Sequence, residues 1–598
     1  ERLINVPDTI TAFTHSEIEK VGIDQLNDFV RLTPGLSLVE ASQSPGIALI
    51  SIRGVGQQLQ SEAPVAVVID GVQTASVSAI NQGLIDVERI EVLKGPQGAL
   101  YGRNAIGGAI NITTVAPTNQ FTGRLTGGYA NGSEEKVEGV LSGPIVPDKL
   151  LFRVAAHYSD FDGTIKNPIT GTNINPLKTE FVRGRLIFTP SDGLTIDLRA
   201  SHDRTENAGF TASYLINGDT GDFTNPPMSD RPGHGRLDVD EVAGKVSIDT
   251  PMGALSSTTA YVNTKDQSDY DLDQSPVAFL DLNTQFTGIR AWSEELRLTS
   301  RADQKLRYTG GFYYVDTQRR RITDVEVIPF ALHLLANARE DNKAWAGFGQ
   351  INYDLSSQLE LTLAGRYDSD KRRQTNLLVG PGSEVSHTFD KFQPKASLAF
   401  KPNENTNFYL TAAQGFRSGG FNTPGPVFNR VYEAEKTTNF EGGVKTQLAD
   451  RRLSLNVAVF STSFENQQIQ LLDITSGQQG IVNIPKTRNR GVEVEMQARP
   501  TSQLTLSGGV GYLDSTITRF DALPIVEGNR PPYSPEWTYN LAVDYTQPVA
   551  NDWDLLLRAQ VTGQAGMYYE YFSRERNFSN LGYLLQKHKI EVRVTRAA

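Results

Sequence analysis

Four motifs follow one another between Leu49 and Val115: Leu49-Ile50-Ser51-Ile52-Arg53-Gly54-Val55-Gly56, Ala63-Pro64-Val65-Ala66-Val67-Val68-Ile69-Asp70-Gly71-Val72, Asp86-Val87-Glu88-Arg89-Ile90-Glu91-Val92-Leu93-Lys94-Gly95-Pro96 and Ala99-Leu100-Tyr101-Gly102-Arg103-Asn104-Ala105-Ile106-Gly107-Gly108-Ala109-Ile110-Asn111-Ile112-Thr113. They contain three β-rich runs, Ile50–Ile52, Val65–Ile69 and Ile90–Leu93, which are separated by Gly, Pro and Asp-Gly turn signals. Glycine recurs at the corners because tight turns need positive φ angles. The stretch therefore predicts one small mixed sheet.

Together, the four motifs resemble the plug domain of TonB-dependent outer-membrane receptors. The preceding residues fit that resemblance, because Val6-Pro7-Asp8-Thr9-Ile10 and Leu32-Thr33-Pro34-Gly35-Leu36 are similar to the start of such a plug. Ser16 and Glu19 have capping-box spacing, and the apolar face of Leu26, Phe29 and Val30 predicts a short helix that ends before Pro34-Gly35. The resemblance implies a small α+β plug over residues 1–116. It also implies that the segment that binds the TonB energy-coupling protein lies upstream of Glu1 and is absent from this chain.

Composition limits the other possible classes. The chain has 598 residues, a formal net charge of −11, 53 Gly, 21 Tyr and no Cys. No run approaches 18 apolar residues, which argues against a helical membrane protein. The lack of Cys excludes a disulfide framework and thiolate metal sites, and the acidic balance argues against nucleic acid as a partner.

Residues 117–598 predict a transmembrane β-barrel. Segments of about ten residues alternate apolar and polar side chains with a period of two, as in Leu504–Tyr512, Leu453–Val459 and Val492–Gln497. A soluble β-propeller or sandwich would also alternate, but a propeller would repeat every 40–50 residues or so, and no such repeat is present.

The connections support a barrel, because short turns alternate with long polar loops. Short turns are expected around Pro190, Pro251, Pro402 and Asp450, and a tight outer hairpin is expected at Asn131-Gly132-Ser133. Long loops are expected near 160–177, 205–237, 266–288, 318–339, 369–390, 417–434, 465–482, 515–534 and 566–581.

Counting these segments gives twenty strands, the last at about Leu584–Thr595. The family builds twenty-two antiparallel strands and usually ends on an aromatic residue, whereas this chain ends on Ala597-Ala598. An open barrel would leave an unpaired strand edge in lipid, which is very costly. Either the last two strands are missing from this sequence or the count merges strands. We expect the first, an all-β barrel of the 22-stranded type whose last strands are missing.

Two carboxylates on the barrel wall are candidates for holding the plug. Alternation turns Glu441 and Glu493 toward the lumen, and in the family the corresponding glutamates pair with two basic plug residues, which match Arg53 and Lys94 here. Lysine at the second position loses the bidentate geometry of arginine. These four residues are called the latch residues below. The alternative is that each charge is merely solvated in a wet lumen.

Ligand-binding candidates follow from the resemblance, since in the family the ligand lies between the plug apices and the outer wall. The candidates are Gln57, Gln58, Gln60, Gln73, Thr74, Phe416, Arg417 and Phe421. Phe416 and Arg417 could instead belong to an aromatic girdle with a snorkelling arginine. Loop charge is mixed, because Arg319-Arg320-Arg321 is expected to face the acidic 266–273 run on another loop. A ferric siderophore is the default cargo, and haem, glycans, cobalamin and other small molecules remain open.

No catalytic motif, nucleotide-binding loop or metal-ligand spacing is present, so an enzyme is not expected and no intrinsic cofactor or metal is predicted. Asp266, Asp269, Asp271 and Asp273 lack the glycine and terminal glutamate of a calcium loop. The prediction is a gated importer, monomeric among the lipids of a Gram-negative outer membrane, that uses a TonB-type partner to import a scarce ligand such as an iron chelate. The alternatives are a passive porin and a secreted β-rich binding module.

Overall fold

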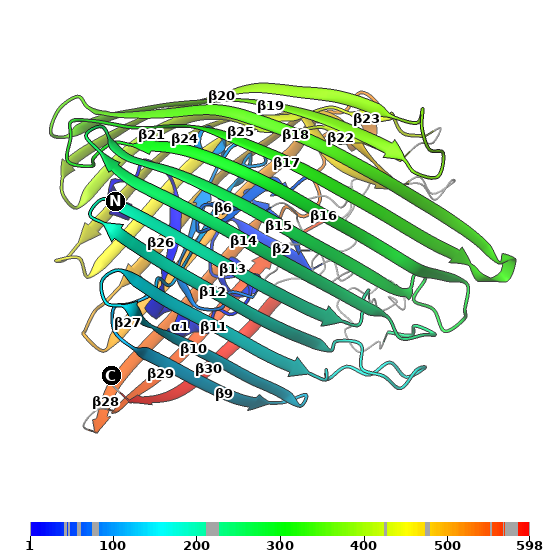
Figure 1. The fold of residues 1–598 in the computed structure, drawn as a ribbon, viewed down its shortest axis with the longest axis horizontal. Coiled ribbons are helices and arrows are strands. Elements are labelled where there is room, and N and C mark those ends of the chain that lie inside the picture. The colour runs from blue at the N-terminus through cyan, green and yellow to red at the C-terminus, as the bar shows by residue number, and fades with distance from the viewer. Residues whose placement is uncertain are drawn as a thin grey trace.

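The computed structural model describes residues 2–40, 45, 48–56, 61–74, 83–210, 227–423, 427–472, 479–550, 553–565, 567–568 and 584–596. An N-terminal domain lies inside a large tilted β-barrel (Figure 1). This arrangement matches the predicted plug and barrel. No helix in the described part of the chain has both the length and the apolar character needed to cross a membrane.

The described residues of the plug form two separate sheets. The larger sheet has the order β1 (Ile10–Thr14), β7 (Val87–Lys94), β8 (Gly108–Thr114), β5 (Val65–Ile69) and β6 (Val72–Gln73), and its β5–β8 pair is parallel. The smaller sheet pairs β2 (Leu36–Glu40), β3 (Ala48–Ile52) and β4 (Val55–Gly56). The prediction that all three β-rich runs share one mixed sheet is therefore wrong, because β3 turns back at Arg53-Gly54 and pairs locally.

Short helices complete the plug: η1 (Leu3–Asn5), α1 (His15–Val21), α2 (Leu26–Val30) and α3 (Gly98–Tyr101). The capping box of α1 uses Thr14 and Glu17 instead of the predicted Ser16 and Glu19, because the helix begins at His15. The predicted apolar face of α2 is buried, and it packs with β3, β5, β7 and β8 in the main core of the plug.

In the part of the chain that the structure describes, twenty antiparallel strands form the wall, and their order is that of a closed barrel. They are β9 (Thr122–Ala130), β10 (Glu134–Val146), β11 (Leu150–Phe161), β12 (Leu177–Ser191), β13 (Leu194–Asn207), β14 (His234–Thr250), β15 (Gly253–Asp271), β16 (Leu280–Thr299), β17 (Leu306–Val327), β18 (Leu332–Asp354), β19 (Leu359–Asn376), β20 (Val385–Asn403), β21 (Thr406–Arg417), β24 (Glu435–Leu448), β25 (Leu453–Leu472), β26 (Gln479–Ala498), β27 (Leu504–Arg519), β28 (Trp537–Ala550), β29 (Trp553–Ala565) and β30 (Leu584–Arg596). The outer connections also carry β22 (Gly420–Phe421), β23 (Val431–Tyr432), η4 (Ile328–Phe330) and η5 (Pro524–Val526).

Several wall strands extend further than the sequence predicted. The expected long loop 318–339 is mostly strand, because β17 ends at Val327 and β18 begins at Leu332. The expected loops 369–390 and 266–288 are shortened in the same way. Side chains on both faces are polar from Asp316 to Arg321 of β17 and from Asp368 to Asn376 of β19, so the apolar half of the alternation is missing there.

The two faces of the wall differ in chemistry. Along β24, Phe440 points outward and is 62% exposed, whereas Thr437, Asn439 and Glu441 point inward and are buried against the plug. Large apolar side chains cover the outer face of the other strands in the same way. The lumen is therefore polar, and the plug is held there largely by hydrogen bonds and ion pairs.

Candidate functional site

Arg53 is the centre of a buried charge cluster between plug and wall. It sits in the β3–β4 turn with a φ of +52°, and its guanidinium leaves the plug toward β24 and β26. Nη1 donates to Glu441 Oε2 at 2.5 Å, while Nε and Nη2 donate to the two oxygens of Glu493 at 3.0 Å each. Arginine can hold two carboxylates in this way because its donors are fixed in a planar fork.

Lys94, at the end of β7, joins the same cluster. Its Nζ lies 3.4 Å from Glu493 Oε2 but only 2.7 Å from Glu495 Oε1. Glu495 was not among the predicted residues, although its place two residues after Glu493 puts it on the same face of β26. The inner cluster, as it is called below, therefore consists of the latch residues and Glu495.

The inner cluster is dry and held from several sides. The side chains of Arg53, Lys94, Glu441 and Glu493 are at most 3% exposed. Thr9 and Tyr409 donate to Glu441 Oε1, and Arg53 lies 4.1 Å from the ring centre of Phe460. Burial disfavours the charged form of Arg53, but Glu441 and Glu493 outweigh it and raise its pKa above the usual range. Arg53 therefore stays charged.

A second group of charges lies nearer the outer ends of the strands, where Glu62 leaves the plug in the β4–β5 connection. Glu62 Oε1 accepts from Arg319 at 3.3 Å and from Arg372 at 3.2 Å, and its Oε2 accepts from Asn104 at 3.0 Å. Burial alone would raise the pKa of Glu62, but the charges of Arg372, Arg319 and Arg103 lower it well below the usual range. Glu62 therefore stays ionised.

The charges around Glu62 continue along the wall. Arg103 of the plug donates to Asp370 at 2.9 Å, and Arg372 also pairs with Asp370, while Glu340 accepts from Arg319 at 3.3 Å. We call Glu62, Arg103, Arg319, Arg321, Glu340, Asp370 and Arg372 the outer cluster. The sequence reasoning missed these residues as a site. The sequence does hold one sign of this site. Four charged residues spaced two apart, which places them on one face of β19, are all buried toward the lumen: Arg366, Asp368, Asp370 and Arg372.

The predicted ligand-binding residues are described only in part. Gln57, Gln58 and Gln60 lie outside the described residues. Gln73 ends β6 and donates to the carbonyl of Arg103 at 3.3 Å, and Thr74 follows it. Phe416 and Phe421 are both buried, and Phe416 packs against Phe389 and Ala434.

Arg417 is not a snorkelling residue of an aromatic girdle, because it is 1% exposed and faces the lumen. It pairs with Glu435 and donates to the carbonyl of Glu62 at 3.1 Å. The predicted contact between Arg319-Arg320-Arg321 and the acidic 266–273 run is also wrong. These arginines belong to β17, whose alternation turns Arg319 and Arg321 inward to the outer cluster.

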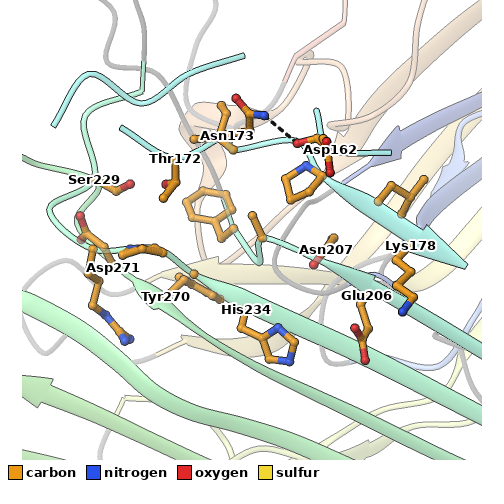
Figure 2. Close-up of a pocket in the computed structure, with 18 of the residues that line it drawn as sticks. Asp162, Thr172, Asn173, Lys178, Glu206, Asn207, Ser229, His234, Tyr270 and Asp271 are labelled. Atoms are coloured by element: carbon orange, nitrogen blue, oxygen red, sulfur yellow. Dashed lines mark hydrogen bonds between the residues drawn. The ribbon is translucent and has the colours of Figure 1, made fainter. Parts of the chain in front are cut away.

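A separate cavity of about 300 Å³ lies among the outer ends of β11 to β15. Figure 2 shows its polar lining, which includes Asp162, Asn173, Lys178, Glu206 and His234. Among the described residues, its lining contains neither the latch residues nor Gln73, Thr74, Phe416, Arg417 or Phe421.

Beside this cavity, Asp230, Asp271 and Asp281 can bring one oxygen each within 4.8 Å of the others. Arg231 already neutralises part of this charge, since it lies 3.0 Å from Asp281 and 3.4 Å from Asp269. Asp266, Asp269, Asp271 and Asp273 do not form a calcium loop. Instead, they follow one strand end, where alternation sends neighbours to opposite faces.

Comparison with protein families identifies both parts of the chain. Residues 2–109 match the TonB-dependent receptor plug domain, and residues 111–586 match the TonB-dependent receptor-like β-barrel. The pesticin receptor of Yersinia enterocolitica is 26% identical over 548 residues, which cover 88% of this chain and 77% of that protein. The probable TonB-dependent siderophore receptor PiuA of Acinetobacter baumannii is 22% identical over 592 residues, which cover 86% and 76%.

Solved structures share the fold. The ferric yersiniabactin uptake receptor FyuA from Yersinia pestis superposes with a TM-score of 0.84 at 21% identity, covering 95% of this chain and 88% of that one. The siderophore receptor PiuA from Acinetobacter baumannii gives a TM-score of 0.79 at 17% identity, covering 100% and 95%. These relatives are receptors rather than enzymes. The chain belongs to the TonB-dependent receptors of the Gram-negative outer membrane.

Proposed function

We propose that this receptor imports a ferric siderophore across the outer membrane, powered by a TonB-type periplasmic protein. One observation carries the proposal. In the described part of the chain, the lumen is filled by a folded domain that is fixed to the wall by buried ion pairs, with smaller apolar contacts such as Val72 against Leu237 and Val239. Such a contact is strong while water is excluded and weakens once water enters, so it suits a plug that must stay seated and later yield. The names of the relatives support iron chelates as the cargo class.

In this proposal the latch residues keep the idle plug in place. Arg53 bridges two wall strands, β24 and β26, so the cations of one plug face engage two neighbouring parts of the barrel. The alternative is that each charge is solvated separately. It fits poorly with the side chains of Arg53, Glu441 and Glu493, which are at most 3% exposed. Unpaired charges in so dry a place would be strongly destabilising.

The N-terminal segment offers a place for a pull to begin. Lys445 donates to the carbonyl of Leu3 at 3.0 Å, Asn407 to that of Ile4 at 2.8 Å, and Thr411 to that of Pro7 at 2.9 Å. Asp8 pairs with Lys395 at 2.7 Å. These contacts precede Thr9, which touches Glu441 of the inner cluster. A force on the N-terminus would therefore load this segment first and the inner cluster next.

The test is growth of an iron-starved strain in which this receptor is the only one for iron chelates. We expect growth on at least one ferric siderophore, and loss of that growth when the TonB-type partner is deleted. Purified receptor in liposomes should not pass small sugars. Free sugar flux without a partner would instead support a porin, and growth on no iron chelate would refute the cargo.

A further inference from the structure

Glu62 fills a position that is built to hold an anion. Its Oε1 lies between the guanidinium groups of Arg319 and Arg372, which come from β17 and β19. Both arginines are at most 11% exposed. Arginine recognises carboxylates and other planar anions through the planar set of donors on its guanidinium group, and two such groups hold the Glu62 carboxylate.

The outer cluster has more positive than negative charge. Four guanidinium groups, from Arg103, Arg319, Arg321 and Arg372, face three carboxylates, from Glu62, Glu340 and Asp370. Arg321 points inward beside Arg319, and it makes no hydrogen bond or ion pair with any residue that the structure describes. If Glu62 moved away, four cations would face two carboxylates.

Neighbouring polar atoms also lack partners. Nε of Arg417 and Oε1 of Glu435 are buried, and neither has a hydrogen-bond partner among the described residues. Arg417 is close to Glu62, since it donates to the carbonyl of that residue at 3.1 Å. Such a buried donor and acceptor can each take one more hydrogen bond, from a water molecule or from a ligand.

We propose that Glu62 is an internal stand-in for the cargo, and that an anionic iron chelate displaces it from Arg319 and Arg372, with Arg321 supplying the additional positive charge. This inference rests on the proposed function and names the chemistry of the cargo: a chelate with carboxylate, catecholate or phenolate oxygens. A neutral chelate has no charge with which to compete against an ionised glutamate. Binding of the anionic chelate would free the Glu62 side chain from the wall.

The experiment uses the full chain in detergent and two ferric complexes of similar size, a trianionic tris-catecholate and a neutral trihydroxamate. Binding is measured by titration calorimetry. The Glu62→Gln variant removes the competing charge and keeps the side-chain shape. Glu433→Gln is the matched control, because it removes one exposed outer carboxylate that makes no ion pair in the described structure. The Arg321→Gln variant makes the opposite change, because it removes one positive charge from the outer cluster.

We expect the trianionic complex to bind more tightly than the neutral one. Glu62→Gln should tighten its binding about tenfold, Arg321→Gln should weaken it about tenfold, and Glu433→Gln should leave it unchanged, because charge-assisted hydrogen bonds are the strong ones. The inference is overturned if the trianionic complex does not bind, or if Glu62→Gln and Glu433→Gln have equal effects. Tight binding and cellular import of the neutral complex alone would overturn it and leave the proposed function standing. Import of no chelate by cells would refute the proposed function instead.

Discussion

Replacing Arg53 by methionine is the most direct test of how the plug is held. Methionine fills much of the same space but leaves the buried Glu441 and Glu493 and the half-buried Glu495 with Lys94 as their remaining cationic partner. Removing one partner of a buried ion pair costs about 3–5 kcal/mol. Since about 1.4 kcal/mol corresponds to a factor of ten, the plug should open from about a hundred to a few thousand times more often.

The assay is amide hydrogen exchange of β3, which ends beside Arg53, with wall strand β13 as the internal reference. Glu19→Gln is the matched control, because it breaks a plug–wall ion pair with Arg124 whose side chains are both 43% exposed. Such an exposed pair is worth about 0–1 kcal/mol.

The triple variant Arg53→Met/Glu441→Gln/Glu493→Gln leaves the Lys94–Glu495 pair intact and strands no carboxylate of the latch. It should recover most of the lost protection, since removing all the partners of a buried charge is much less costly than removing one. Two results would refute the ion-pair reasoning. One is exchange of the β3 amides in Arg53→Met that stays within about threefold of the rate in the unmodified chain. The other is exchange in the triple variant that is as fast as in Arg53→Met.

Three further predictions concern other plug–wall contacts. Gly54→Ala should destabilise plug seating by more than Gly71→Ala, as measured by exchange of β3: both have positive φ, but a Cβ at Gly54 would lie 2.8 Å from Leu513 whereas Gly71 faces open space. The pKa of Glu62 is lower in the folded protein than in the unfolded chain. The free energy of unfolding of the unmodified chain should therefore exceed that of the Glu62→Gln variant by its full amount at neutral pH, and by less as the pH falls below about 4. An equal difference at pH ~2 and at pH ~7 would contradict this. Lys395→Met should lower the first unfolding force when the N-terminus is pulled in single-molecule experiments, because Asp8 loses its partner.

The fold could be predicted because its signals are local. Period-two alternation and turn chemistry identify wall strands one at a time, and the count of twenty strands agrees with the structure. The strand ends could not be placed, as β17 illustrates. Arg319 to Arg321 lie where polar residues cover both faces, so nothing in the local pattern distinguishes an extended strand from a loop.

The two clusters differ in how far sequence reasoning could reach them. Resemblance of short motifs was enough to pick out Arg53, Lys94, Glu441 and Glu493, and the structure brings these residues together. Their exact partners depend on side-chain reach across the register, so Glu495 and Tyr409 were missed. The outer cluster draws its residues from the β4–β5 and α3 regions of the plug and from β17, β18 and β19. Glu62 is about 250–310 residues away in sequence from Arg319 and Arg372, and a local sequence pattern cannot predict contacts over such a separation.

The two clusters are joined through the plug by a short physical path. Glu62 lies two residues before Pro64, whose carbonyl accepts from the amide of Gly107 at 2.9 Å. The carbonyl of Gly107 in turn accepts from the amide of Gly95 at 3.0 Å, next to Lys94 of the inner cluster. In the same sheet, Gly108 of β8 pairs with Val65 on one side and with Lys94 on the other.

This row of three strands spans only about 10 Å, and it tolerates no side chain at its centre. A Cβ at Gly108 would lie 2.3 Å from the carbonyl oxygen of Leu93. Two backbone hydrogen bonds and one strand therefore connect the segment that follows Glu62 to the segment that holds Lys94. Cargo binding and plug release would act on opposite edges of the same small piece of sheet.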